Sequence, residues 1–178
     1  TDNATNKSAS NEAIVAPAIV RGDAIWSQSD QIPAIATKVD GIVDAYTGAT
    51  AVKCTADNSA VPIGGISPTW KTGLTNWIPA EFGSTYAVKA YICDSGAADP
   101  TTGTQIFDSG SGGTGEWYFN YSSGVLNFIG ETIPAGLTGS KIIAIVGYRY
   151  IGSVGSAALP SNTNIGNINI TTSNITSR

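Results

Sequence analysis

The fold is predicted most directly by the stretch GEWYFNYSSGVLNFIG, residues 115–130. Two runs of aromatic and β-branched residues, 116–121 and 125–129, are separated here by Ser-Ser-Gly. Three loop residues that end in glycine fit a type I turn with the glycine in the left-handed conformation. Side chains alternate between the faces of a strand, so Trp117 and Phe119 share one face and Tyr118 lies on the other. We therefore expect an antiparallel β-hairpin with an apolar face.

The segments around this hairpin also indicate strands. Residues 86–93 show the alternation of a half-buried strand, residues 104–108 are predicted to be a short strand, and residues 141–152 a long one. The run IIAIV within the last segment is predicted to be buried on both faces. In residues 32–57 we favour strands joined by turns over a helix, because β-branched residues and Gly41 weaken a helix. The predicted fold class is all-β, with an antiparallel β-sandwich.

Changes of composition along the chain predict four regions. Residues 1–12 are small and polar and are expected to form a flexible, extended N-terminal arm. Residues 13–73 are predicted to be a β-rich attachment region, and residues 74–152 the β-sandwich module. Residues 153–178 carry repeated Asn-Ile pairs, whose isoleucines we expect to serve assembly: Ile165, Ile168, Ile170 and Ile175. We interpret this region as the start of an intertwined, solenoid-like β-stalk, and the alternative is a disordered tail.

Composition argues against several classes of function. The chain of 178 residues contains no histidine, which excludes Ser-His-Asp triads and His-ligated zinc, and we expect no enzyme, no metal and no cofactor. Only 12% of the residues are charged and the net charge is −4, which argues against nucleic-acid binding. No run of about 20 apolar residues predicts a membrane span. Cys54 and Cys93 are interpreted as two buried thiols, with a single disulfide as the alternative.

Acidic side chains give weak signals for chemistry. Asp94, Asp99 and Asp108 occur in loops and could contribute oxygens to Ca²⁺, but their spacing is not that of an EF-hand. We interpret them as turn aspartates that bond to their own backbone. Glu116 and Glu131 flank the hairpin, yet nothing in the sequence places them across a sugar bond as a glycosidase requires.

Aromatic side chains are the stronger candidates for binding. Trp70, Trp77, Tyr91 and Tyr118 are expected to be exposed and to offer flat faces for stacking on sugars or for protein contact. Trp117 and Phe119 are interpreted as core residues instead.

Three stretches carry a resemblance to a known family. These are Trp77-Ile-Pro with Phe82-Gly-Ser, the hairpin at 117–130, and Gly147-Tyr-Arg-Tyr-Ile-Gly152. Together with the Asn-Ile pairs, they resemble a β-domain of virion fibre and appendage proteins of tailed bacteriophages, especially marine cyanophages. The resemblance covers about residues 74–178 and none of the N-terminal region.

This resemblance implies a structural protein on the virion surface with a role in host attachment. The expected assembly is an oligomeric tail fibre, a homotrimer, anchored to other virion proteins through its N-terminal region. No catalytic residue follows from the resemblance. Two alternatives remain open at this point: a carbohydrate- or receptor-binding module that contacts a host surface glycan, and a subunit of a bacterial surface layer or pilus.

Overall fold

The computed structural model describes residues 24–112, 114–130 and 132–155. The described chain falls into two compact units, of which the larger is Gln28–Ser153 and the smaller contains residues 24–27 and 154–155. The predicted N-terminal arm and the assembly isoleucines, Ile165, Ile168, Ile170 and Ile175, lie outside the described residues.

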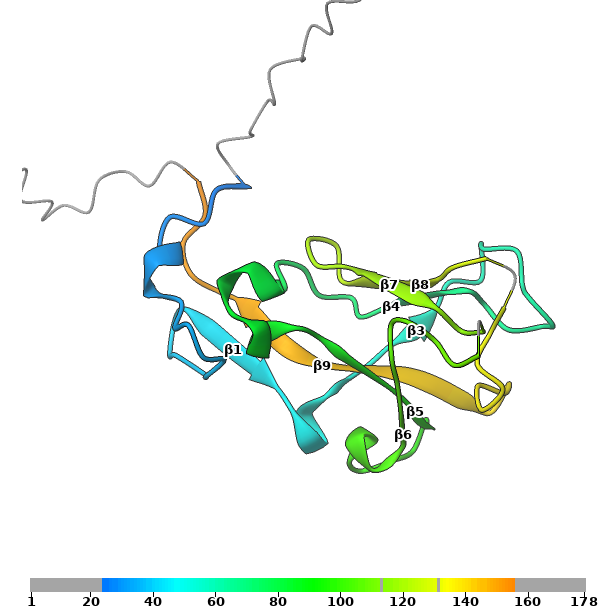
Figure 1. Ribbon diagram of the computed structural model, residues 1–178. Helices are drawn as coiled ribbons and strands as arrows, with labels where there is room; N and C mark the ends of the chain where they lie inside the picture. Colours follow the sequence, from blue (N-terminus) through cyan, green and yellow to red (C-terminus); the bar gives the residue numbers. More distant parts are fainter. Residues whose placement is uncertain (1–23, 113, 131, 156–178) are drawn as a thin grey trace, which may run out of the picture. The chain divides into compact units, whose positions relative to one another are not determined.

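Strand β9 (Lys141–Tyr150) is the centre of the first antiparallel sheet. Strand β5 (Lys89–Asp94) pairs along one side of β9, and β6 (Thr104–Ile106) continues the sheet beyond β5. The other side of β9 pairs with β1 (Val43–Tyr46) near its end and with β2 (Val52–Lys53) near its middle. Figure 1 shows this sheet as a layer around the long β9 arrow.

The second antiparallel sheet has the order β3-β4-β8-β7. Its strands are β3 (Thr55–Ala56), β4 (Thr69–Lys71), β8 (Val125–Phe128) and β7 (Trp117–Asn120). Strands β7 and β8 form the predicted hairpin, with Gly124 in the left-handed conformation at φ 67°. The prediction of the hairpin and of its buried face, which carries Trp117 and Phe119, is confirmed.

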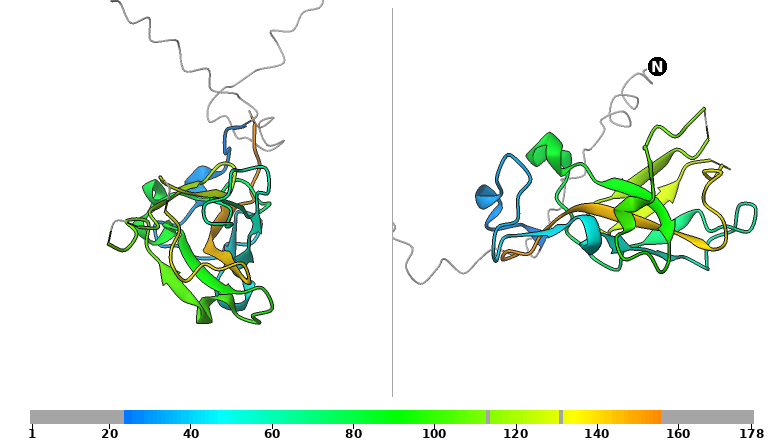
Figure 2. Two further views of the ribbon diagram at one scale, coloured as in Figure 1. Left: turned by 90° about the vertical axis from the view of Figure 1, so that its right-hand side faces the viewer. Right: turned by 90° about the horizontal axis from the view of Figure 1, so that it is seen from below.

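The two sheets are joined at one side by a continuous segment of chain. Only Cys54 separates β2 from β3, and its N–H donates to the carbonyl of Ile143 at 2.8 Å. The chain therefore passes from the first sheet to the second without a loop. On the opposite side, β6 and β7 are the last strands of their sheets. Figure 2 shows the same strands from two further directions.

One hydrophobic core receives side chains from both sheets. Ile92, Ile143 and Ile145 come from the first sheet, and Phe119 and Leu126 come from the second. Strand β9 is fully buried from Ile143 to Ile145, as its apolar run predicted. The 3₁₀ turns η3 (Gly48–Thr50) and η6 (Pro100–Thr102) lie against each other, and η6 also contacts β5 and β9.

The sheets cross the boundary that was predicted between residues 73 and 74. Strands β1 and β2 pair with β9, and β4 pairs with β8, so residues 43–71 contribute to the same two sheets as residues 89–150. The local sequence does not reveal these pairings because each joins strands that are far apart along the chain. Residues 32–57 form strands and 3₁₀ turns, in agreement with the preference for strands over a helix.

The beginning and the end of the larger unit lie next to each other. The Ser153 N–H donates to Gln28 Oε1 at 2.8 Å, and the Gln28 N–H donates to the Tyr150 hydroxyl at 3.0 Å. The smaller unit shows the same relation, because Trp26 and Val154 form an antiparallel bridge. The blue beginning and the orange end of the described chain can be followed side by side in Figures 1 and 2.

Candidate functional site

Two of the aromatic residues predicted to be exposed belong to the core instead. Trp70 and Trp77 are only 5% and 1% exposed. Their indole N–H groups donate to backbone carbonyls, that of Trp70 to Ser67 at 3.0 Å and that of Trp77 to Leu74 at 3.1 Å. The prediction that these two tryptophans are exposed is therefore wrong: each is buried in the core and has its polar atom satisfied internally.

The other two predicted binding aromatics reach the surface. Tyr118 lies on β7 and is 51% exposed. Tyr91 lies on β5, is half-buried, and its hydroxyl donates to Gln105 Oε1 at 3.4 Å. Tyr118 thus lies on the outer strand of its sheet, and Tyr91 lies on the strand next to β6.

A cleft of about 400 Å³ lies beside β6 and β7, and we call it the β6–β7 cleft. Such a volume is in the lower part of the range of small-molecule sites. Phe107, which follows β6, is 63% exposed at the cleft and faces solvent as Tyr118 does. The cleft is lined by residues of β5, β6, β7 and the adjoining loops: Ala87, Val88, Lys89, Gln105, Ile106, Phe107, Asp108, Trp117, Tyr118, Phe119 and Tyr121.

Trp117 lines the β6–β7 cleft and also carries a buried polar atom. Its side chain is 7% exposed, and its Nε1 is the one buried side-chain polar atom without a hydrogen-bond partner among the described residues. A buried donor without an acceptor costs about 1–3 kcal/mol. By contrast, Tyr121 accepts a hydrogen bond from the Val88 N–H at 3.3 Å, and burial raises the pKa of its phenol.

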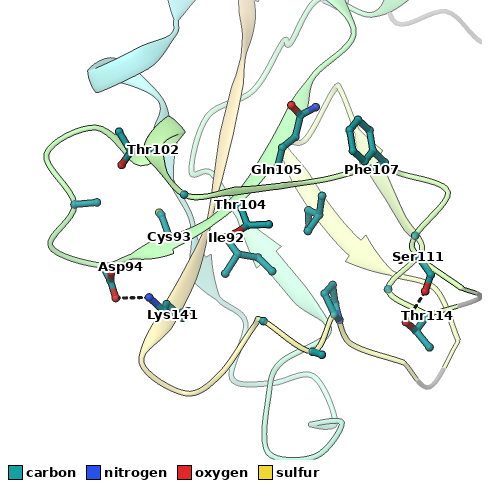
Figure 3. Close-up of a pocket in the computed structure, with 18 residues that line it drawn as sticks. Ile92, Cys93, Asp94, Thr102, Thr104, Gln105, Phe107, Ser111, Thr114 and Lys141 are labelled. Atoms are coloured by element: carbon teal, nitrogen blue, oxygen red, sulfur yellow. Dashed lines mark hydrogen bonds and ion pairs between the residues drawn. The ribbon is translucent and has the colours of Figure 1, made fainter.

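A larger hollow of about 700 Å³ lies on the other side of β6, between that strand and the loop 134–136 (Figure 3). Some of its polar groups are paired with each other: Lys141 Nζ lies 2.7 Å from Asp94 Oδ1, and the Thr114 hydroxyl donates to the Ser111 carbonyl at 2.9 Å. Gln105 and Phe107 point to the same side of β6 in Figure 3.

The acidic residues with candidate roles have structural partners. Asp99 accepts from the Thr101 N–H at 2.9 Å at the start of η6, and Asp108 accepts from the Ser109 N–H at 2.9 Å. Both behave as turn aspartates, as we had interpreted them. Glu116 is exposed, whereas Glu131 is outside the described residues. Within the described ranges, no group of three or more acidic or cysteine side chains could hold a metal ion.

The two cysteines are free and buried, which agrees with the interpretation as thiols. Burial, together with the nearby Cys93, raises the pKa of the Cys54 thiol to about 12. Burial also raises the pKa of Cys93. Thiols with raised pKa values are poor nucleophiles and poor metal ligands at neutral pH.

Comparison of the chain with protein-family models, curated proteins and solved structures found no match. The likeness to phage fibre domains therefore stays a prediction made from the sequence. No helix in the part of the chain that the structure describes is both long and apolar enough to cross a bilayer.

Sequence reasoning did not identify Phe107 or the Trp117 N–H as site features. Phe107 lies in the segment 104–108 that was predicted to be a short strand, and nothing in the sequence distinguishes an exposed phenylalanine from a buried one there. Trp117 was correctly assigned to the core, but the absence of an acceptor for its N–H depends on all of its neighbours. The alternation of residues 117–121 was the one signal that marked Tyr118 as exposed.

Proposed function

We propose that the chain is a structural component of a bacteriophage virion and assembles into an oligomeric, trimeric fibre. In this proposal the unit Gln28–Ser153 is a β-sandwich module, and the Asn-Ile segment 164–175 packs against its copies in a stalk. The few charges and the absence of histidine suit a protein that acts through assembly and contact rather than through catalysis.

The observation that supports this proposal is the proximity of the two ends of the unit. Gln28 and Ser153 are hydrogen-bonded to each other, so the chain enters and leaves the unit at one place. A domain whose two ends are adjacent can be inserted into another structural element without disrupting that element. The module would thus stand to the side of a fibre axis formed by the preceding and following segments.

This arrangement changes which residues are proposed to anchor the fibre. Strands within 43–71 belong to the two sheets, so they are committed to the module. Attachment to other virion proteins is therefore assigned to the segment that precedes Gln28. The stalk is assigned to the segment that follows Ser153.

The native mass of the full chain in solution tests the assembly. A trimer of the 18.2 kDa chain has a mass of about 55 kDa by light scattering. Replacing Ile165, Ile168, Ile170 and Ile175 together by serine should reduce the mass to that of one chain, because the stalk loses its apolar contacts. The matched control also replaces four isoleucines by serine. These are exposed and lie outside the Asn-Ile segment: Ile25, Ile35, Ile129 and Ile151.

A mass of one chain for the unaltered protein would contradict the trimer. Mass spectrometry of purified particles tests the virion assignment separately. Detection in cell envelopes, with absence from purified particles, would favour the surface-layer or pilus alternative and contradict a virion protein.

The second candidate function is carbohydrate binding, and the β6–β7 cleft is the observation that favours it. Its exposed Phe107 and Tyr118 offer flat faces, whereas the buried Trp70 and Trp77 no longer support such a role. The two functions are compatible, since an oligomeric fibre presents several copies of a weak binding site together.

A further inference from the structure

We propose that the β6–β7 cleft binds a neutral pyranose residue of a glycan, with Tyr118 and Phe107 as stacking faces and the Trp117 N–H as a hydrogen-bond donor. The proposal rests on the carbohydrate-binding function and assigns its ligand class and residues. It does not depend on assembly into a fibre, because every residue of the cleft lies in the unit Gln28–Ser153.

The position of the cleft explains why a ligand can reach it. Strands β6 and β7 are the outer strands of their sheets, and the cleft extends from residues 105–108 to residues 117–121. The backbone amide of Trp117 donates to the backbone carbonyl of Asp108 at 3.1 Å, which joins the end of the β6 segment to the start of β7. The hydrophobic core therefore comes close to the surface at this side of the unit.

The walls of the cleft suit the faces of a sugar ring. Phe107 and Tyr118 are among the large apolar side chains that remain exposed, at 63% and 51%. Exposed aromatic rings at a concave site can cover the C–H faces of a pyranose. Removing these apolar surfaces from water favours binding. Both rings belong to outer strands or their ends, where side-chain rotation meets little obstruction.

The buried indole is the second, independent observation. Trp117 Nε1 has no acceptor among the described residues, whereas Trp70 and Trp77 donate to carbonyls in the same unit. In the proposed complex the ligand enters at the open edge of β7, and a sugar hydroxyl oxygen accepts the Trp117 indole N–H. The ligand thus satisfies a donor whose burial is otherwise costly.

The polar groups at the rim favour an uncharged ligand. Lys89 and Asp108 both line the cleft, and their opposite charges cancel. Gln105 adds an amide, whose oxygen is shared with the Tyr91 hydroxyl and whose nitrogen can donate. The hydroxyl groups of a sugar match this mixture of donors and acceptors. A strongly acidic glycan would find no excess of positive charge in the cleft.

The first experiment measures binding of the full chain to neutral disaccharides. The probes are α- and β-linked disaccharides of glucose, galactose, mannose and N-acetylglucosamine, titrated to 20 mM and followed by isothermal calorimetry. A single shallow site predicts a dissociation constant of about 1 mM for at least one probe. Absence of binding to every probe at 20 mM overturns the proposal.

Two exposed-residue variants then locate the site. Tyr118→Ala is expected to weaken binding about tenfold, because it removes a stacking face. Ile129→Ala is the matched control, since Ile129 is also 51% exposed and lies outside the cleft. Binding that survives in Tyr118→Ala, or that falls equally in Ile129→Ala, contradicts the assignment.

Indole N–H signals in a ¹H–¹⁵N spectrum test the role of Trp117 without depending on folding of a core variant. The probe that binds should shift the Trp117 indole signal and leave those of Trp70 and Trp77 in place, because these two are already hydrogen-bonded. The spectrum of Trp117→Phe serves only to assign the signal. A shift confined to the other indoles would place the ligand elsewhere and overturn the proposal.

Failure of these measurements leaves the assembly proposal intact, because the native mass does not depend on the cleft. Conversely, a chain that is monomeric but binds a neutral disaccharide at Tyr118 would support the cleft and contradict the trimeric fibre. The two proposals are therefore separable.

Discussion

The Ser153 N–H donates a hydrogen bond of 2.8 Å to the Gln28 side-chain oxygen, which joins the last residue of the larger unit to its first. Tyr150 reinforces this connection, because its hydroxyl accepts from the Gln28 N–H and donates to the Ser153 carbonyl at 2.6 Å. One tyrosine of β9 thus positions both ends of the unit.

Replacing Tyr150 by phenylalanine should loosen the two ends. The change leaves the Gln28 N–H and the Ser153 carbonyl without this partner, which predicts a loss of about 1–3 kcal/mol in the free energy of unfolding. Urea denaturation measures the loss, and amide hydrogen exchange should rise near Gln28. Tyr148→Phe is the control, since Tyr148 is on the same strand and packs its ring edge-on against Tyr86. Equal losses in both variants would contradict a special role for the Tyr150 hydroxyl.

The turn of the β7–β8 hairpin requires glycine at position 124 for two reasons. Gly124 has a φ of 67°, and a Cβ there would overlap with the Leu74 carbonyl and the Thr72 hydroxyl. Gly130 has a similar φ of 74° but open space around it. We expect Gly130→Ala to cost about 1 kcal/mol from backbone conformation, and Gly124→Ala to cost at least about 2 kcal/mol more from the overlap. Thermal denaturation compares the two, and equal costs would show that the neighbours of Gly124 can move aside.

Trp77 is expected to stabilise the fold rather than to bind a ligand. It is 1% exposed and meets Phe119 edge-on at a ring-centroid distance of 5.6 Å. Trp77→Ala should therefore reduce the free energy of unfolding by about 3–5 kcal/mol. The exposed Tyr118→Ala should change it by no more than about 0.5 kcal/mol. Chemical denaturation of both variants checks this, and a small effect of Trp77→Ala would contradict its place in the core.

An ion pair between Asp57 and Lys71 predicts a pH dependence of stability. A hydrogen bond from Lys71 at 2.6 Å, followed by hydrogen bonds from Ser59, lowers the pKa of Asp57 from 3.8 to about 2. A carboxyl with a lowered pKa stabilises the fold above its unfolded-state pKa, and this contribution disappears as the pH falls from about 4 to about 2. Asp57→Asn should therefore be less stable than the unaltered protein at pH 7 and equally stable near pH 2.

Urea denaturation at several pH values measures this difference. The control is Asp40→Asn, because the Asp40 side chain is 99% exposed and lies 4.0 Å from Lys38. A constant difference between Asp57→Asn and the unaltered protein from pH 7 to pH 2 would contradict the role of the Asp57 charge.

The buried thiols should be unreactive in the folded protein. Burial raises the pKa of Cys54 to about 12 and raises that of Cys93, so little thiolate forms at pH 8. We expect a disulfide reagent such as DTNB to modify no more than a small fraction of the two thiols under native conditions and both in denaturant. Rapid modification of the native protein at pH 8 would show that this region of the core opens readily.

The sequence alone identified the elements whose signals are local. The Ser-Ser-Gly turn, the alternation through Trp117 and Phe119, and the apolar run at 142–146 predicted the hairpin and the central strand. Two antiparallel sheets agree with the predicted all-β class. These features depend on neighbours within a few residues, because the side-chain period and the turn geometry are set by the backbone itself.

Tertiary structure decided the partners of each strand and the exposure of each aromatic side chain. The pairing of β1 with β9 brings residues 43–46 into the sheet that residues 74–152 were expected to form alone, and Trp70 is buried because β4 pairs with β8. The β6–β7 cleft exists because β6 and β7 end their sheets on the same side of the core. Such relations depend on contacts between distant segments, and the spacing of residues along the chain does not encode them locally.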